Sequence, residues 1–242
     1  MAQVINTNIG ALFAGAALNK SALALQTAQQ RLSSGLRINS SKDDPTGLGI
    51  AVGYDSQVRG TNIAVRNAND AISKAQTLDG YGAQITENLQ RLHEIFIQTG
   101  DVATTESTAL IGENARIAAL TAVPGNLLGA SVTVDGSGGT YTPLSAAITA
   151  PAATTAAGTL TDITAVTASR AKYGADMTAL GSAVTTMQST SVNLSASYSR
   201  IMDTDYAAET TAMTRNNILQ QAGSAVLAQA NQTPNSVLSL LR

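Results

Sequence analysis

The most constraining feature of the chain is the spacing of large apolar side chains between residues 163 and 201. They recur at alternating steps of three and four residues, and two polar residues, Arg170 and Ser191, interrupt the set. This spacing predicts one long amphipathic helix of the coiled-coil type. At about 1.5 Å per residue the helix would be roughly 58 Å long, so its apolar stripe needs a second long helix to cover it.

Residues 45–99 carry a stripe of the same kind and supply the covering helix. Apolar and small residues follow the three-four spacing from Ala51 to Phe96. Around Ala75 two three-residue steps fall together, a pattern that locally overwinds a supercoil. We therefore predict a mainly α fold in which long antiparallel helices form a coiled-coil bundle.

Two adjacent carboxylates, Asp43 and Asp44, stand directly before this second helix, and Pro45 suits its first turn. A neighbouring pair of acids could serve in acid/base catalysis. Acidic residues just before a helix more often cap it and interact favourably with its dipole. We interpret both residues as structural.

The middle of the chain predicts smaller elements. Residues 104–123 have the pattern of a shorter helix, and residues 131–144 alternate apolar positions around a glycine-rich turn, which indicates a small β-hairpin. Residues 145–159 are rich in Ala and Thr and predict an extended surface loop. Asp135, beside the hairpin glycines, offers too few oxygen ligands for calcium.

Both ends of the chain are apolar, free of acidic residues and patterned as helices, over residues 1–36 and 217–242. Residues 37–44 and 202–209 interrupt the pattern and indicate linkers. Isolated helices with uncovered apolar stripes are marginal in water. We therefore expect both ends to be largely disordered in the monomer and to fold when neighbouring molecules cover them.

Composition excludes several classes of function. Only 12% of residues are charged, the net charge is -2, and no basic cluster is interleaved with aromatic residues, so a nucleic-acid binder is not indicated. Cysteine is absent, which removes disulfides and thiolate chemistry. No apolar run approaches the roughly 20 residues of a membrane-spanning helix. No basic residue precedes the apolar residues 9–18, so a secretory signal peptide is not expected.

The residue types also argue against an enzyme. His93 is the sole histidine, it falls inside a predicted helix, and no second ligand stands at metal spacing. The HExxH motif of zinc peptidases is absent. We predict no catalytic residues, no metal and no cofactor, and we interpret His93 as a solvated or interface side chain.

Six motifs at both ends and along the long helices resemble bacterial flagellin, the subunit of the flagellar filament. They are MAQVINTN at 1–8, QRLSSGLRINSSKDD at 30–44, RNANDAISKAQT at 66–77, LQRLHEI at 89–95, SRIMDTDYAAE at 199–209 and ILQQAGSAVLAQANQTPNSVLSLLR at 218–242.

The resemblance implies a minimal flagellin without large outer domains. It has an inner terminal-helix coiled-coil domain, two linkers, a helical tube-forming domain, and a short hairpin and loop in place of the variable outer domains. The corresponding residues are 1–36 with 210–242 for the inner domain, 37–44 and 202–209 for the linkers, 45–128 with 160–201 for the tube-forming domain, and 129–159 for the hairpin and loop.

The same resemblance implies a function and a set of partners. The subunit would be exported by the flagellar type III apparatus and would self-assemble into the extracellular filament used for swimming. Its partners would be further flagellin subunits, an export chaperone, and cap and hook-associated proteins, with no nucleic acid and no membrane insertion. The implied residues for assembly of the inner core are Ile5, Ile9, Leu12, Leu18, Leu25, Leu32, Ile218, Leu219, Val226, Leu238 and Leu241.

The motif LQRLHEI resembles the segment of flagellins that a host innate immune receptor recognises. The candidate residues are Leu89, Gln90, Arg91 and Glu94, while the family usually has Arg at the position of His93. In this setting we interpret Arg170 and Ser191 as places where the apolar stripe meets solvent or a neighbouring subunit.

Two alternatives to the filament subunit stay open at this point. A hook-filament junction protein shares the terminal architecture, and the DDP sequence at 43–45 resembles that group. A type III needle or translocator component would also be helical and free of cysteine, although a translocator needs membrane-inserting stretches. The closing sequence VLSLLR at 237–242 favours the filament subunit.

Overall fold

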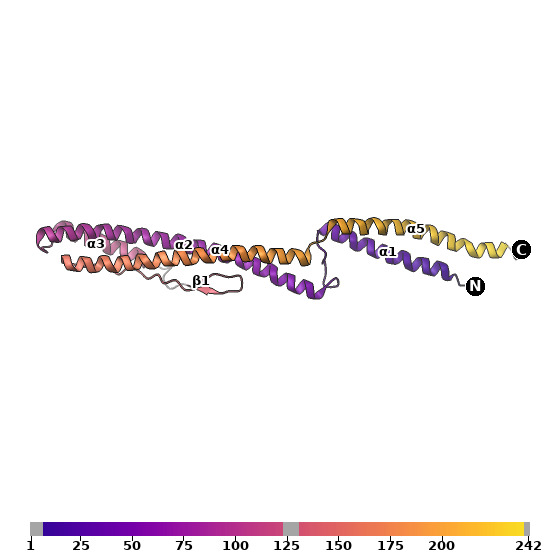
Figure 1. Ribbon diagram of the computed structural model, residues 1–242, viewed down its shortest axis with the longest axis horizontal. Helices are drawn as coiled ribbons and strands as arrows, with labels where there is room; N and C mark the ends of the chain where they lie inside the picture. The colour runs from indigo at the N-terminus through magenta and orange to yellow at the C-terminus, as the bar shows by residue number, and fades with distance from the viewer. Residues whose placement is uncertain (1–6, 123–130, 240–242) are drawn as a thin grey trace. The chain divides into compact units, whose positions relative to one another are not determined.

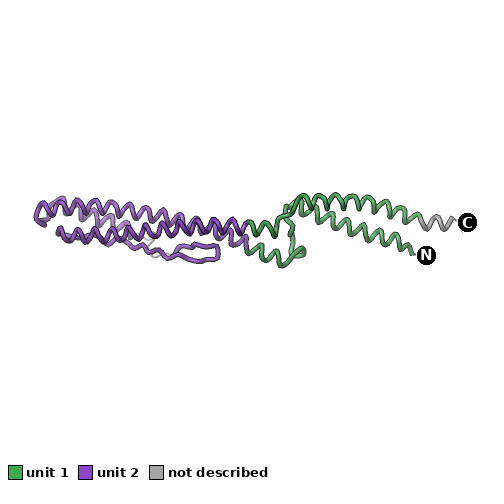
Figure 2. Tube along the Cα trace, in the orientation of Figure 1, with its two compact units in different colours: residues 1–53, 196–242 green, residues 54–195 purple. Residues whose placement is uncertain are grey.

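The computed structural model describes the backbone of residues 7–122 and 131–239, and the side chains of these ranges as far as residue 232. The fold is mainly helical with one small antiparallel sheet, as predicted (Figure 1). The chain divides into two compact units, unit 1 (residues 1–53 and 196–242) and unit 2 (residues 54–195), which Figure 2 colours separately. The elements are α1 (Ile9–Ser34), α2 (Pro45–Thr99), α3 (Thr105–Thr121), β1 (Val132–Thr133), β2 (Thr140–Tyr141), α4 (Ala156–Met202) and α5 (Tyr206–Ser239).

Unit 2 is built on the two predicted apolar stripes, which pack α2 against α4. The helices are antiparallel, because Asp79 contacts Arg170 while His93 contacts Ala156. The central residues of both stripes are buried in one continuous core, other stripe residues pack against it half-buried, and alanines of α2 let the helices approach closely. The largest buried side chains from these two helices are Leu78, Ile85, Leu89, Leu92, Phe96, Val166, Tyr173 and Leu180.

Arg170, which interrupts the stripe of α4, forms an ion pair with Asp79 inside the subunit. Its Nε donates a hydrogen bond to Asp79 Oδ1 at 2.8 Å. The aliphatic part of Arg170 lies over Gly82, where an added β-carbon would come within 2.7 Å of Arg170 Cγ. Helix α2 thus supplies both the partner of Arg170 and the room for its side chain. About one third of that side chain stays exposed to solvent, and contact with a neighbouring subunit stays a prediction. Ser191 is half-buried.

Helix α4 begins at Ala156, inside the segment predicted to be a surface loop. Three side chains fix its first turn. The Thr155 hydroxyl accepts a hydrogen bond from the Gly158 N–H (3.2 Å), and Asp101 Oδ1 accepts one from the Ala156 N–H (2.7 Å). His93 Nδ1 lies 3.0 Å from the Ala156 carbonyl oxygen. His93 is thus half-buried and bonded to the start of α4 within the subunit, and its exposure to solvent or to a neighbouring copy stays a prediction.

The two aspartates before α2 have the structural role that was predicted for them. Asp44 Oδ1 accepts a hydrogen bond from the Gly47 N–H at 2.8 Å and caps the helix. Asp43 accepts the backbone N–H groups of Asn39 and Ser40, and these bonds hold the pKa of its carboxyl below the ordinary value. Neither carboxylate is positioned as half of an acid/base pair.

The small sheet lies where the glycine-rich turn predicted it. Val132 pairs with Tyr141 and Thr133 with Thr140 in an antiparallel register. Asp135 Oδ1 closes the turn by accepting the N–H groups of Ser137 and Gly139, each at 2.7 Å.

In unit 1 the chain segments that follow α1 and α4 run beside each other. The Arg37 N–H donates to the Met202 carbonyl at 2.6 Å, and the Thr204 N–H donates to the Gly35 carbonyl at 2.9 Å. Gly35 ends α1 in the left-handed conformation, with φ of 70°. Asp205 accepts backbone N–H groups of the next turn, so α5 starts inside the segment 202–209 that was predicted to be a linker.

Candidate assembly surface

Helices α1 and α5 pack antiparallel along their length in unit 1. The fully buried residues of α1 are small, Ala14 and Ala28, and Leu18 is half-buried. A β-carbon built on Gly223 would lie 3.3 Å from Leu18 Cδ1, which shows how closely the two backbones approach. Polar contacts mark both ends of the pair. They are the hydrogen bond from Asn8 Nδ2 to the Ala230 carbonyl (2.8 Å) and the ion pair between Arg31 and Glu209 (3.7 Å).

Each of these helices also carries a second apolar face, turned away from the partner helix. On α1 the large side chains of this face are Ile9, Leu12, Phe13 and Leu23, and Phe13 is 78% exposed. On α5 they are Ile218, Leu219 and Val226, all of them exposed. We call these seven residues the outward faces. Contiguous exposed apolar side chains of this size mark a surface that another protein covers.

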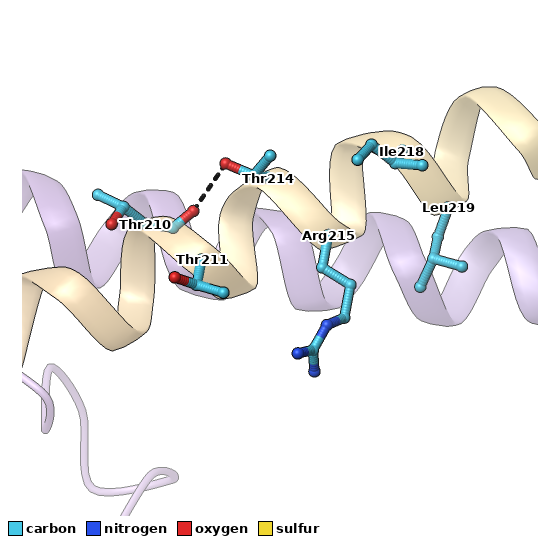
Figure 3. A pocket seen from close by; sticks show the side chains of 6 residues that line it. All are labelled: Thr210, Thr211, Thr214, Arg215, Ile218 and Leu219. Atoms are coloured by element: carbon cyan, nitrogen blue, oxygen red, sulfur yellow. Dashed lines mark hydrogen bonds between the residues drawn. The ribbon is translucent and has the colours of Figure 1, made fainter.

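A shallow hollow lies on the outward face of α5 (Figure 3). The hydroxyls of its three threonines donate to carbonyl groups of their own helix, as Thr214 does to Thr210 at 2.9 Å, so their methyl groups remain for contact. Arg215 forms no ion pair within the part of the chain that the structure describes. The lining residues are Thr210, Thr211, Thr214, Arg215, Ile218 and Leu219.

Comparison with known proteins shows what kind of chain carries this surface. The family model of the bacterial flagellin N-terminal helical region matches residues 5–126, and the model of the bacterial flagellin C-terminal helical region matches residues 157–241. The chain belongs to the bacterial flagellin family. As a flagellin it is a structural subunit of the extracellular flagellar filament and not an enzyme, and it polymerises with other flagellin subunits.

Individual relatives agree with the family models over the whole chain. Flagellin FlaB2 of Treponema pallidum is 34% identical over 285 aligned positions, covering 99% of this chain and 100% of the relative. The flagellar filament 33 kDa core protein of Treponema phagedenis is 33% identical with the same coverage. Polar flagellin B/D of Vibrio parahaemolyticus is 29% identical over 377 positions, covering 100% of both chains. These alignments are longer than the 242 residues of this flagellin, so each relative carries residues without a counterpart here.

The assembly residues predicted from the flagellin motifs fall into three groups in the structure. Ile9, Leu12, Ile218, Leu219 and Val226 lie on the outward faces. Leu18, Leu25 and Leu32 are half-buried. Ile5 and Leu241 lie outside the described residues, as does the side chain of Leu238.

Phe13 and Leu23 belong to the outward face of α1 but were not among the predicted assembly residues. A signal was present, because Phe13 is one of only two phenylalanines in the chain and directly follows Leu12. The seven-residue repeat that selected Leu18, Leu25 and Leu32 follows the face toward α5 and passes over these two positions.

The four residues of the predicted receptor segment lie on different sides of α2. Leu89 is fully buried in the core of unit 2, whereas Gln90, Arg91 and Glu94 are exposed. Arg91 donates hydrogen bonds to Glu106 at 3.0 Å and to Glu94 at 3.2 Å. These bonds, the one to Glu106 first, raise the pKa of the Arg91 guanidinium above its ordinary value.

The described residues hold no cluster of three or more acidic or histidine side chains that could bind a metal ion. Within the same residues, no helix has both the length and the hydropathy needed to cross a membrane.

Proposed function

We propose that this flagellin polymerises through unit 1, where the outward faces of α1 and α5 are covered by neighbouring copies of the chain. The single observation that carries the proposal is the exposure of seven large apolar side chains on a helix pair that belongs to a polymerising family. Complete burial of such a side chain contributes about 1.5–3 kcal/mol. Several buried together at each contact can offset the entropy lost on association.

In this proposal the chain has the parts that the flagellin motifs implied. Residues 1–36 and 210–242 form the inner coiled coil, and residues 45–128 and 160–201 form the surrounding tube. The linkers of residues 37–44 and 202–209 join these parts, and residues 129–159 take the place of outer domains. The contact of α1 with α5 and the continuous core shared by α2 and α4 support this division.

Further partners follow from the same surfaces. Before assembly the exposed outward face of α5 needs cover, and we propose that an export chaperone supplies it during delivery through the type III apparatus. Cap and hook-associated proteins would meet the same terminal helices at the ends of the filament. For recognition by an innate immune receptor we propose Gln90, Arg91 and Glu94 as the contact residues, since Leu89 is buried.

The test introduces one charge at the centre of each outward face. In Phe13→Asp and Ile218→Asp the carboxylate would have to be buried unpaired between copies, so we expect filaments to be lost while the helical content of the monomer is kept. The matched controls Phe13→Leu and Ile218→Leu keep an apolar side chain and should assemble. Electron microscopy after salt precipitation scores filaments, and circular dichroism checks the monomer. Normal filaments from both charged variants would disprove the proposal.

A further inference from the structure

The segment between the two matched family regions, residues 131–155, is packed into unit 2 rather than lying on it as a loose loop. It begins with the hairpin and continues as an extended chain toward α4. In the extended part, side chains along one side are buried, while neighbours such as Leu144 are exposed. A buried segment without regular secondary structure must find other partners for its backbone groups. The buried residues are Pro143, Ser145, Ile148 and Pro151.

One carboxylate of α4 accepts two of these backbone groups and two hydroxyl groups of the segment. Asp176 is fully buried and accepts the N–H groups of Leu144 (2.9 Å) and Ser145 (2.8 Å). It also accepts the hydroxyl of Tyr141 at 2.7 Å and the hydroxyl of Ser145. All four donors come from five consecutive residues of the segment.

Four other side chains each bond one backbone group along the rest of the segment or at its junction with α4. They come from the turn after α2, from α3 and from α4, so both matched family regions contribute. The bonds are Tyr173 Oη to the Ala146 carbonyl (2.7 Å), the Ile148 N–H to Thr121 Oγ1 (3.1 Å), the Ala153 N–H to Asp162 Oδ2 (3.1 Å) and the Ala156 N–H to Asp101 Oδ1 (2.7 Å).

The hairpin turn rests directly on α2. A β-carbon built on Gly136 would collide with the Gln57 carbonyl oxygen and with Thr61 Oγ1. One built on Gly60 would lie 2.6 Å from the Gly136 carbonyl oxygen. Two glycines therefore allow the turn to touch the helix backbone, which is a second point of attachment, separate from Asp176.

Asp176 and the segment depend on each other. A buried carboxylate is costly unless hydrogen-bond donors replace water, and among the described residues Asp176 has no ion-pair partner. Burial alone raises the pKa of Asp176, but the hydrogen bonds from Ser145, Leu144 and Tyr141 outweigh it, so the pKa lies below the ordinary value. The donors that keep this carboxylate ionised all belong to the segment.

We propose that residues 131–155 form a strap that Asp176 locks onto unit 2, so that this part of the flagellin surface is fixed within each subunit and not by contact with neighbouring copies. The strap ties the N-terminal family region to the C-terminal one through Thr121 and Asp176. It occupies the stretch that belongs to neither family model. The proposal is independent of how unit 1 assembles.

Site-resolved hydrogen exchange on the full-length monomer tests the lock with the variant Asp176→Asn. The asparagine side chain has the size of the aspartate but carries no charge. Its NH₂ group cannot accept the hydrogen bonds that one carboxylate oxygen of Asp176 accepts. We expect the amides of Leu144 and Ser145 to exchange about tenfold to a hundredfold faster, with the amides around Ile85 unchanged. Asp43→Asn is the matched control, because Asp43 also accepts two backbone N–H groups but lies in unit 1, and it should leave the strap amides unchanged.

A second readout uses Tyr141, whose pKa is raised to about 12 by burial and by its hydrogen bond to the charged Asp176. In Asp176→Asn the spectrophotometric titration of this phenol should move toward its ordinary value. Unchanged protection of Leu144 and Ser145 together with an unchanged Tyr141 titration would overturn the proposal.

Two further variants separate the role of Asp176 from that of the hairpin turn and from a general loss of folding. In Gly136→Val the amides of the hairpin turn should exchange faster, while those of Leu144 and Ser145 stay protected. Equal loss of protection in the turn and at Leu144 and Ser145 would show that the turn, rather than Asp176, holds the strap. If Asp176→Asn unfolds all of unit 2, the milder Ser145→Ala decides. Faster exchange confined to the strap in Ser145→Ala supports the lock, whereas uniform loss across unit 2 overturns it.

Discussion

The two units of this flagellin use the same sequence pattern but bury it by different means. In unit 2 the apolar stripes of α2 and α4 cover each other, and Phe96 is only 1% exposed. In unit 1 the fully buried residues of α1 are the small Ala14 and Ala28, while Phe13 is 78% exposed on the other side. Three-four spacing therefore indicates a buried face but does not say whether the same chain buries it.

The difference has an energetic consequence. Alanine and glycine at the α1–α5 contact allow close approach, yet each buries little apolar area, so the pair gains less free energy per residue than the core of unit 2. A helix pair of this kind is marginal by itself. We therefore interpret unit 2 as a fold with a large apolar core of its own and unit 1 as a fold that its neighbours complete.

The largest effect is expected when one half of unit 1 is removed. Deletion of residues 1–36 or of residues 210–242 should abolish filaments and leave a soluble helical body formed by unit 2. Electron microscopy and circular dichroism of the truncated proteins check both parts. Filaments of ordinary stability from either truncated protein would show that unit 1 is not needed for assembly.

The two phenylalanines of the chain form a matched pair for the next test, because one lies in each unit. Phe96→Ala leaves a cavity in the core of unit 2 and should lower the free energy of unfolding by about 3–5 kcal/mol. Phe13→Ala removes an exposed side chain and should change the stability of the monomer by about 0.5 kcal/mol or less. Denaturant titration of both monomers measures the values, and similar losses for the two variants would argue against the comparison.

A smaller effect is expected at the close contact between α1 and α5. Gly223→Leu forces a branched side chain against Leu18 and should weaken the pair by about 1–3 kcal/mol. Gly15 of α1 is the control, since an added β-carbon there meets nothing within 4 Å. Gly15→Ala should stabilise the helix by about 0.5–1 kcal/mol. The melting temperature of the filaments ranks the two variants. A lower melting temperature for Gly15→Ala than for Gly223→Leu would show that α1 and α5 do not make their close contact at Gly223.

The smallest effect is expected at the Arg170–Asp79 ion pair of unit 2. Both side chains are about one third exposed, so solvent screens the interaction. Arg170→Met keeps the aliphatic packing over Gly82 and should cost about 1 kcal/mol or less, with a smaller cost at high salt. A loss of several kcal/mol in urea titration would show that unit 2 depends on this pair more than on its apolar core.

The regular spacing of apolar residues in the sequence predicted the long helices and the faces that they bury. The stripe through Val166, Tyr173 and Leu180 and its partner stripe in α2 are buried as expected, because large apolar residues at regular steps share one helix face. The cap at Asp44 and the hairpin turn at Asp135 were also accessible, since both depend on residues close in sequence.

Features that depend on single contacts between distant residues could not be predicted in this way. Asp176 bonds donors more than thirty positions away, and nothing in its immediate sequence indicates a buried carboxylate. Arg170 looked like a break in the stripe, because Asp79 and Gly82 meet it only after α2 and α4 have packed. Phe13 was not selected because the seven-residue repeat through Leu18 and Leu25 passes over it.

Hydrogen exchange of monomer and filament compared residue by residue tests the central claim most directly. We predict that amides around Ile85 in α2 are protected alike in both states. Amides around Leu18 in α1 and Gly223 in α5 should exchange about a hundredfold or more faster in the monomer than in the filament. Equal protection of α1 and α5 in the two states would show that unit 1 is complete without neighbours and would contradict the account.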